Sequence, residues 1–292
     1  MPELPEVESI KVQLNKYLVG HKLAGSDIAY SNFQGDANRL NGAKIYQVRR
    51  FGKVLSLDFD NGYSLLSHIK LTGQYLYRGP NLKKPKLSKK VLGGIPGKHT
   101  HIIFKLDNNG FLFYNDVRKF GWLKVIKTKD VEKDVFIKKL GPEPLTNITK
   151  SPLKALTPSI FKEILSKTKR GIKVLLMDQT KIGGIGNIYA NDALWLARIH
   201  PERSANSLKV KEIKLLFKSI EEVLKHGLKQ GGASELSYVT PDGSEGNYQN
   251  VSTAYGKVNV ACPRQECQRI KAKFTKKMVG GRGTYYCKNC QQ

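Results

Sequence analysis

The sequence predicts an α+β protein in which an N-terminal helix, a β-rich region, a helical region and a cysteine-rich end follow one another. Three observations predict this order. Apolar residues alternate with polar ones between hairpin turns over residues 21–127, and helical periodicity replaces the alternation after residue 157. All four cysteines lie in the last 31 residues. A chain of 292 residues with 40% hydrophobic content can fold into about two domains.

The first element is a helix over residues 5–18, which place apolar side chains at roughly helical spacing. Pro5 fits the first helical position, and Glu6 suits the positive end of the helix dipole. The opening MPELPEVE has a second interpretation. Removal of Met1 would leave Pro2 with a free secondary amine, which can attack an aldehyde and form an iminium ion. These residues alone favour helix initiation and leave the reactive amine as an alternative.

Residues 21–127 predict two packed antiparallel sheets. The segment KVLSLDFD alternates apolar and polar residues before Asn61-Gly62, a strong hairpin signal. HIIFKLD and FLFYNDV flank a second hairpin turn at Asn108-Asn109-Gly110. Residues 81–98 have no period and many lysines, so we expect a basic, mobile loop there.

The remaining chain divides into a linker, a helical domain and a cysteine module. Apolar residues recur with helical spacing over 208–228, whereas 231–250 is an irregular polar stretch. The turn GGIGN (183–187) lies between two helical segments and is either a phosphate-binding turn or a tight helix connection. We therefore expect domain limits at 1–127, 128–156 (linker), 157–250 and 251–292.

The charge predicts a polyanionic partner. Fifty Lys and Arg residues against 24 Asp and Glu give a net charge of +26, and the excess is spread along the chain. Neutralising phosphates releases counterions and drives binding to nucleic acid, although an anionic membrane surface is a competing partner. No apolar run is long enough to span a bilayer, and no signal peptide is visible, so we expect a cytoplasmic protein.

The cysteines predict one structural zinc site. Two pairs, with four and two intervening residues, are separated by 19 residues and can supply four thiolates. Four protein ligands leave no open position for chemistry at the metal. The basic segment between the pairs contains Gly280-Gly281 and predicts a hairpin. The ligands are Cys262, Cys267, Cys287 and Cys290.

Three segments in this order resemble the formamidopyrimidine-DNA glycosylase and endonuclease VIII family of base-excision repair enzymes. They are PELPEVE at the N-terminus, DQTKIGGIGNIYANDALWLARIHP in the middle and GRGTYYCKNCQ at the end. The resemblance covers nearly the whole chain. It implies a two-layered β-sandwich after the N-terminal helix, then a helix–two-turn–helix domain with a zinc-finger hairpin. It also implies that residues 231–250 form the loop that covers an extruded base.

The resemblance also assigns catalytic residues. Pro2 corresponds to the nucleophile, Glu3 to the adjacent acid and base, and Glu6 to a supporting carboxylate. Lys53 in RRFGKVL corresponds to the catalytic lysine of a β-hairpin, and Arg282 to the zinc-finger arginine that clamps the phosphates of the lesion.

Further positions correspond to DNA-binding residues. HIKLTG and NDVRKFG match the turns that wedge into the duplex and fill the space of the extruded base, as base flipping requires. The Arg-x-Phe pattern favours the branch that acts on oxidised purines. For His99, DNA contact and structural hydrogen bonding are both open. The predicted DNA-binding residues are Leu71, His99, Arg118, Phe120, Lys173 and Asn187.

The sequence departs from the family pattern at the first cysteine pair, where four residues replace the usual two. Leu71 stands where the family has Met, and Val117 and Lys119 replace a Pro and an Arg. The longer first cysteine pair leaves the metal ligands in place but puts the hairpin geometry in question.

The resemblance therefore implies a bifunctional glycosylase and abasic-site lyase that acts on oxidised purines in damaged duplex DNA. It implies a monomer with one structural zinc ion, no organic cofactor and no membrane partner. Two alternatives stay open. One is an endonuclease VIII-like preference for oxidised pyrimidines, and the other is a non-catalytic protein that binds damaged DNA.

Overall fold

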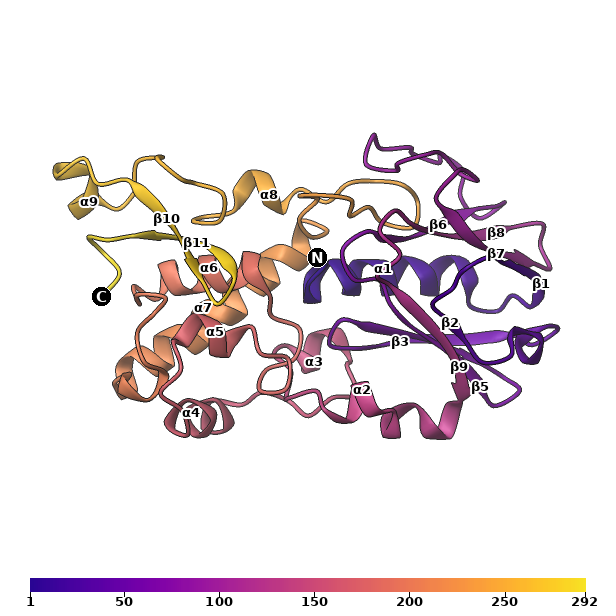
Figure 1. Ribbon diagram of the computed structural model, residues 1–292, viewed down its shortest axis with the longest axis horizontal. Coiled ribbons are helices and arrows are strands. Elements are labelled where there is room, and N and C mark those ends of the chain that lie inside the picture. The colour runs from indigo at the N-terminus through magenta and orange to yellow at the C-terminus, as the bar shows by residue number, and fades with distance from the viewer. The chain divides into compact units, whose positions relative to one another are not determined.

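The computed structural model describes residues 1–292, which form two compact units (Figure 1). Unit 1 comprises Met1–Lys139 and Leu228–Tyr248, and unit 2 comprises Leu140–Gly227 and Gln249–Gln292. No helix combines the length and the apolar character that crossing a bilayer would require.

Unit 1 contains two sheets that pack face to face, so the predicted β-sandwich is confirmed. One sheet has the strand order β1-β7-β8-β6, and the other has the order β2-β9-β5-β4-β3. All neighbouring strands are antiparallel except the short pair β2 and β9. The strands are β1 (Leu23–Ile28), β2 (Phe33–Gln34), β3 (Ile45–Phe51), β4 (Val54–Phe59), β5 (Tyr63–His68), β6 (Gly73–Arg78), β7 (Thr100–Leu106), β8 (Phe111–Asp116) and β9 (Trp122–Lys127).

Helix α1 (Leu4–Leu18) completes the core of unit 1. Its apolar face, which includes Val7, Ile10 and Leu14, is buried in one cluster with side chains of both sheets. Figure 1 shows α1 alongside both sheets. The predicted hairpin turns at Asn61-Gly62 and Asn108–Gly110 join β4 to β5 and β7 to β8. The N-terminal residues are therefore held against the sandwich by a buried helix.

The region predicted as a linker contains short helical segments. They are a 3₁₀ helix (Thr128–Lys133), α2 (Val135–Lys138) and α3 (Thr146–Thr149). Asp134 ends the 3₁₀ helix and caps α2, because its carboxylate accepts the backbone N–H of Phe136.

Unit 2 is helical and ends in a β-hairpin. Its longest helix, α7 (Val210–Lys229), extends two residues into unit 1 and buries one apolar face. Gly227 allows α7 to approach α6 closely, because a Cβ at this position would lie 2.5 Å from the ring of Tyr189. The other elements are α4 (Pro158–Ser166), α5 (Ile172–Leu176), α6 (Asn187–Leu196), a 3₁₀ helix (Ala205–Ser207), α8 (Tyr248–Val251), α9 (Gln265–Arg269), β10 (Phe274–Val279) and β11 (Arg282–Cys287).

Segment 228–248 belongs to unit 1, whereas the expected domain limits place residues 231–250 in the helical domain. Its backbone and side chains form hydrogen bonds with α1, β6 and the loop 81–98. These contacts join residues more than 140 positions apart, so no local sequence pattern indicates them.

Candidate active site

The N-terminus of unit 1 brings together Pro2, Glu3 and Glu6, all of which are buried. The Glu6 carboxylate accepts the backbone N–H of Glu3 through Oε2 and that of Ala233 through Oε1, each at 2.7 Å. Gly232 packs against Glu6, and two features require glycine at this position. Its φ is +86°, and an added Cβ would lie 2.7 Å from Glu6 Cγ. Glu6 therefore connects the start of the chain to the segment 228–248.

Segment 228–248 also contacts the loop 81–98, which the sequence predicted as basic and irregular. The loop contains no helix or strand, but its Lys86 and Ser88 backbone N–H groups donate to the carbonyls of Asp242 and Gly243 at 3.0 and 3.3 Å. The Lys90 ammonium lies 2.9 Å from a carboxylate oxygen of Glu245. The two segments thus form one surface of unit 1.

Lys53 lies in a tight hairpin between β3 and β4. Phe51 pairs with Val54, so Gly52 and Lys53 form a two-residue turn. A positive φ at Gly52 (+58°) and not at Lys53 is the pattern of a type II′ turn. Lys53 is only 4% exposed. The turn therefore holds its ammonium group in a fixed, buried place.

His68 lies near this lysine at the end of β5. Burial, reinforced by the charges of Lys70 and Lys53, lowers the pKa of His68 to about 3. The imidazole is therefore neutral at physiological pH, and its Nδ1 accepts the backbone N–H of Lys70 at 3.0 Å. This bond shapes the turn that follows β5.

Two turns leave the same end of the sandwich. We name residues 69–72 the Leu71 turn and residues 117–120 the Arg118 turn. The first precedes β6 and the second follows β8, and Gly73 pairs with Asp116 where the two strands meet. Each turn has one lysine with a left-handed backbone, Lys70 or Lys119.

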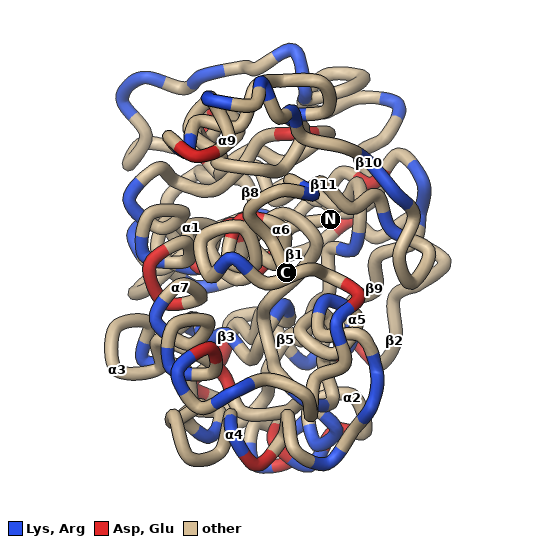
Figure 2. The backbone as a smooth tube through the Cα atoms, turned by 90° about the vertical axis from the view of Figure 1, so that its left-hand side faces the viewer, with Lys and Arg blue, Asp and Glu red and all other residues tan.

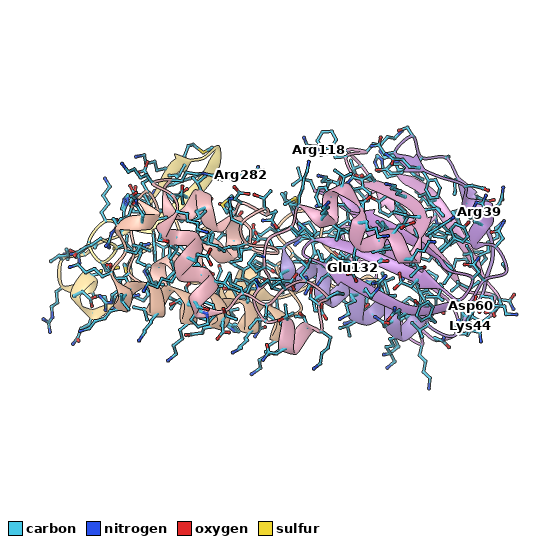
Figure 3. All side chains as sticks on the ribbon, turned by 90° about the horizontal axis from the view of Figure 1, so that it is seen from below. Arg39, Lys44, Asp60, Arg118, Glu132 and Arg282 are labelled. Carbon is cyan, nitrogen blue, oxygen red and sulfur yellow. The ribbon has the colours of Figure 1, made fainter.

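The predicted wedge residues occupy these turns. Leu71 is partly exposed, Arg118 is exposed, and Phe120 is 52% exposed. The guanidinium of Arg118 stacks 4.5 Å from the centroid of the Phe120 ring. Figure 3 shows Arg118 at the outer surface of its unit. Both turns therefore present side chains outward that can enter a duplex.

His99 and His101, which flank Thr100 at the start of β7, differ in their surroundings. His101 is buried, its Nε2 lies 2.9 Å from the carbonyl oxygen of Asp116, and its ring stacks on Tyr30. These contacts make His101 a structural residue. His99 is half-buried, and its carbonyl accepts the backbone N–H of Asp116. Its DNA contact stays a prediction.

In unit 2, the GGIGN turn is supported by one glutamine. Gln179 donates to the carbonyl of Ile185 at 2.7 Å, and its side-chain oxygen accepts the N–H of Gly184 at 3.0 Å. Helix α6 begins at Asn187 directly after the turn. The positive end of the helix dipole lies at this turn and favours a phosphate there.

Three predicted residues meet around one carbonyl group of the β10–β11 hairpin. The carbonyl oxygen of Gly283 accepts from Asn187 Nδ2 and from Lys173 Nζ, each at 3.1 Å. Arg282 precedes this glycine and is exposed, as Figure 3 also shows. Asn187 and Lys173 therefore fix the backbone beside Arg282.

Lys173, for which the resemblance implies a DNA contact, is completely buried, and its ammonium also donates to Thr284 Oγ1 at 2.7 Å. Its DNA contact stays a prediction. A buried ammonium needs such partners to offset its lost hydration. Lys173 thus supports the hairpin from within and does not present its charge to solvent.

The four cysteines form one buried cluster whose sulfur atoms all lie within 4.8 Å of one another. Tetrahedral zinc with Zn–S bonds of about 2.3 Å requires sulfur atoms about 3.8 Å apart. Two of the six separations are close to this value, at 3.8 Å for Cys262 and Cys290 and 3.6 Å for Cys267 and Cys287. The longer first knuckle is accommodated by the short helix α9.

The surroundings of the cluster favour a bound cation. Burial raises the pKa of the Cys267 and Cys290 thiols, and the neighbouring Cys287 and Cys262 add to this at Cys290. A dication would remove this penalty by stabilising the thiolates. The Asn289 amide also donates to Cys267 Sγ at 3.3 Å. The donor set fits a structural Zn²⁺ that would hold the hairpin and take no part in a reaction.

The basic charge is distributed over both units. Figure 2 shows Lys and Arg along most of the backbone, with Asp and Glu fewer, in agreement with the net charge of +26. Such a surface favours a polyanion as partner.

Residues 1–123 match the family described as the formamidopyrimidine-DNA glycosylase N-terminal domain, and residues 140–238 match its H2TH domain. The formamidopyrimidine-DNA glycosylase of Lactococcus lactis subsp. cremoris is 37% identical over 297 residues, which cover 100% of both chains. The chain belongs to the formamidopyrimidine-DNA glycosylase family.

Solved structures of family members have the same fold. The wild-type Lactococcus lactis enzyme in complex with DNA containing N7-benzyl-Fapy-dG superposes with a TM-score of 0.83 at 36% identity, with both chains covered completely. A complex of the Lactococcus lactis enzyme with DNA containing an abasic site also gives 0.83 at 36% identity, over 99% of both chains. The predicted family and fold are thus confirmed over the full length.

Asp116 stands in the NDVRKFG segment, but the family resemblance gives it no role. It is completely buried at the end of β8, between the Leu71 and Arg118 turns. Its position directly before the predicted wedge residues Arg118 and Phe120 was the one sequence signal that could have indicated a role.

Proposed function

We propose that this chain removes formamidopyrimidines and 8-oxoguanine from duplex DNA and then cleaves the strand at the resulting abasic site. The full-length likeness to family members solved with formamidopyrimidine and abasic-site DNA carries this proposal. The basic surface and the fit of the cysteine cluster to zinc support it. The enzyme acts as a monomer on chromosomal DNA in the cytoplasm.

The nucleophile in this proposal is the secondary amine of Pro2. While Met1 is attached, the Pro2 nitrogen is an amide without a nucleophilic lone pair, so the proposal concerns the chain after removal of Met1. The amine attacks C1′ of the damaged nucleoside, and the bond from C1′ to the base breaks as the base leaves with a proton. Glu3 protonates the ring oxygen as the sugar opens, and an iminium ion joins Pro2 to C1′.

The iminium ion then withdraws electrons from the sugar. Loss of a proton from C2′ expels the 3′ phosphate by β-elimination, and a further δ-elimination expels the 5′ phosphate. Glu3 carries protons in these steps, and Glu6 holds the backbone beside it through the bond to Glu3 N–H. Lys53, buried in its tight turn, offers a fixed ammonium group for the base or the phosphate.

The other residues bind DNA. Arg282 and the start of α6 at Asn187 hold phosphates, a role in which the bidentate geometry of arginine is favourable. Leu71, Arg118 and Phe120 fill the space of the extruded base, and segment 231–250 covers that base. His99 contacts the DNA backbone from the sandwich. Oxidised pyrimidines are the alternative substrates.

Borohydride reduction tests the chemistry, because it traps the iminium ion as a stable covalent adduct. We expect an adduct between the processed chain and a duplex containing 8-oxoguanine, and much less from a Pro2→Gly variant. No adduct from the natural chain, or an equal adduct from the variant, would contradict the mechanism. An intact-mass measurement on the same sample establishes that Met1 has been removed.

Excision rates on matched duplexes test the substrate. We expect faster release of 8-oxoguanine than of thymine glycol, since the Arg-x-Phe pattern is that of the purine branch. A reversed order would assign the chain to the oxidised-pyrimidine branch without affecting the proposed chemistry.

A further inference from the structure

Asp116 is a buried carboxylate without an ion-pair partner. It is 0% exposed, and it is held by hydrogen-bond donors alone. Its Oδ1 accepts from Thr72 Oγ1 at 2.5 Å and from Arg118 N–H at 3.2 Å. Its Oδ2 accepts from Gly121 N–H and from the Tyr30 hydroxyl, both at 2.8 Å. A charge buried in this way is tolerated only because these donors replace its hydration.

Two of these donors come from the turns that carry the wedge residues: Thr72 ends the Leu71 turn, and Arg118 lies in the Arg118 turn. Gly121 directly follows the Arg118 turn, and Tyr30 precedes both turns in the sequence. The Thr72 hydroxyl contacts both sides at once, because it donates to Asp116 and accepts the backbone N–H of Arg118 at 3.0 Å. One carboxylate and one hydroxyl thus join two turns that are about 45 residues apart in sequence.

The space around this group leaves little freedom. A Cβ at Gly121 would lie 2.0 Å from the Tyr114 hydroxyl, and a Cβ at Gly73 would lie 2.6 Å from the same oxygen. Tyr30 reinforces the arrangement, since its hydroxyl also lies 2.8 Å from the carbonyl oxygen of Gly121. The two turns are therefore packed as one body.

We infer that Asp116 and Thr72 are positioning residues that lock the two turns together, so that Leu71, Arg118 and Phe120 enter the duplex as one rigid wedge. The inference rests on the proposed function, in which these three side chains replace an extruded base. Inserting three side chains together is favourable when their geometry is set in advance, because no ordering is then required during extrusion. Loosening the lock should slow extrusion of a base more than reactions at a site that has no base.

The test compares two substrates on one enzyme preparation. The substrates are identical duplexes, one with 8-oxoguanine opposite cytosine and one with a preformed abasic site at the same position. Thr72→Val removes the bridging hydroxyl with little change of volume. We expect its single-turnover rate on 8-oxoguanine to fall about 10-fold or more, while cleavage at the abasic site changes less than about threefold.

Two further variants separate positioning from stability. Thr72→Ser keeps the hydroxyl and should restore most of the excision rate. Ser64→Ala is the matched control, because it removes a buried hydroxyl bond of 2.6 Å to Asp58 in the same sandwich, away from both turns. It should lower the melting temperature and leave the ratio of the two rates unchanged.

A stopped-flow measurement decides the inference independently of catalysis. A 2-aminopurine next to a stable abasic analogue reports the unstacking caused by wedge insertion. We expect slower insertion by Thr72→Val than by the natural chain. An unchanged insertion rate, or an equal loss of both activities, would overturn the inference. If the natural chain showed neither excision nor trapping, the proposed function would be overturned instead. The insertion rates would still show whether Asp116 and Thr72 hold the two turns together.

Discussion

Two tight hairpins, one in each unit, carry cations that the proposed function requires, and they present them differently. In the β3–β4 hairpin the cation Lys53 is itself a turn residue and is buried. In the β10–β11 hairpin the turn is Gly280-Gly281, and the cation Arg282 is the first residue of the next strand and is exposed. The first hairpin fixes its charge in advance, whereas the second leaves its charge accessible to a ligand.

The glycine patterns of the two turns agree with this difference. A positive φ at Gly52 alone matches a type II′ turn, whereas positive φ at both Gly280 and Gly281 matches type I′. A type II′ turn accepts an ordinary residue such as Lys53 at its second position. A type I′ turn excludes most side chains, so the arginine lies outside it.

The largest effect is expected from removal of the metal. Chelation, or a Cys287→Ser/Cys290→Ser double substitution, should unfold the β10–β11 hairpin and lower the affinity for duplex DNA by about 100-fold or more, since structural zinc supplies the folding energy of such modules. Zinc content and fluorescence anisotropy with abasic-analogue DNA measure the two quantities.

Unit 1, which contains the β3–β4 hairpin, is the internal control for metal removal. Near-ultraviolet circular dichroism of the tyrosine-rich sandwich should persist, because none of the cysteines lies in unit 1. Full affinity in a sample shown to lack zinc would contradict the role of the metal.

The second prediction is that Lys53 mainly affects the reaction rate and Arg282 mainly affects the affinity for DNA. Lys53→Met should lower the single-turnover rate by about 100-fold with little change in Kd, because a preorganised charge acts mainly on the transition state. Arg282→Ala should raise Kd by about 10-fold and reduce the slope of log K against log salt by about 0.9, the value for one phosphate contact. Rates and salt titrations on the same duplex measure both effects.

Arg282→Lys is the control for the second hairpin. It keeps the charge and therefore the salt slope, but it loses the bidentate fork and should recover the affinity only in part. If Lys53→Met changed Kd as strongly as Arg282→Ala, the distinction between the two hairpins would be lost.

The smallest effect concerns the type I′ turn itself. Gly281→Ala should cost about 1 kcal/mol of stability, since it forces alanine into a left-handed backbone in open space. Gly280→Ala should cost about 1 kcal/mol more, because its Cβ would lie 2.9 Å from Val174 Cγ2. Thermal unfolding of the zinc-loaded protein measures both.

A double substitution checks the cause of the glycine effect. Combining Gly280→Ala with Val174→Ala should remove the steric part and leave the backbone part, so the cost of the alanine should approach that at position 281. Equal costs of the two single glycine substitutions would exclude Val174 as the cause.

Much of the fold follows from local patterns. Alternation and turn residues indicated the hairpins at Asn61-Gly62 and Asn108–Gly110, helical spacing indicated α1 and α7, and cysteine spacing indicated the metal cluster. Each of these signals lies within a few tens of residues. The sequence therefore predicted these elements and that the β-strands build two packed sheets.

The order of strands and the use of individual side chains could not be predicted in this way. Glu6 contacts Ala233, 227 residues away, and no periodic pattern encodes that pairing. Lysine is usually exposed, so nothing in the sequence indicated that Lys173 is buried beneath the hairpin. Asp116 was visible as an acid beside the wedge, but its hydrogen bonds depend on how two distant turns meet.

The bond from Glu6 to Ala233 also bears on synthesis of the chain. Because segment 228–248 completes unit 1, a nascent chain that has released only the first 139 residues lacks the Ala233 N–H that binds Glu6 Oε1. The N-terminal unit is thus finished only after most of the chain has left the ribosome. A fragment cut after residue 139 would have both sheets and still lack part of the support of the N-terminus. Under the proposed function, such a fragment would lack part of the support of its nucleophile.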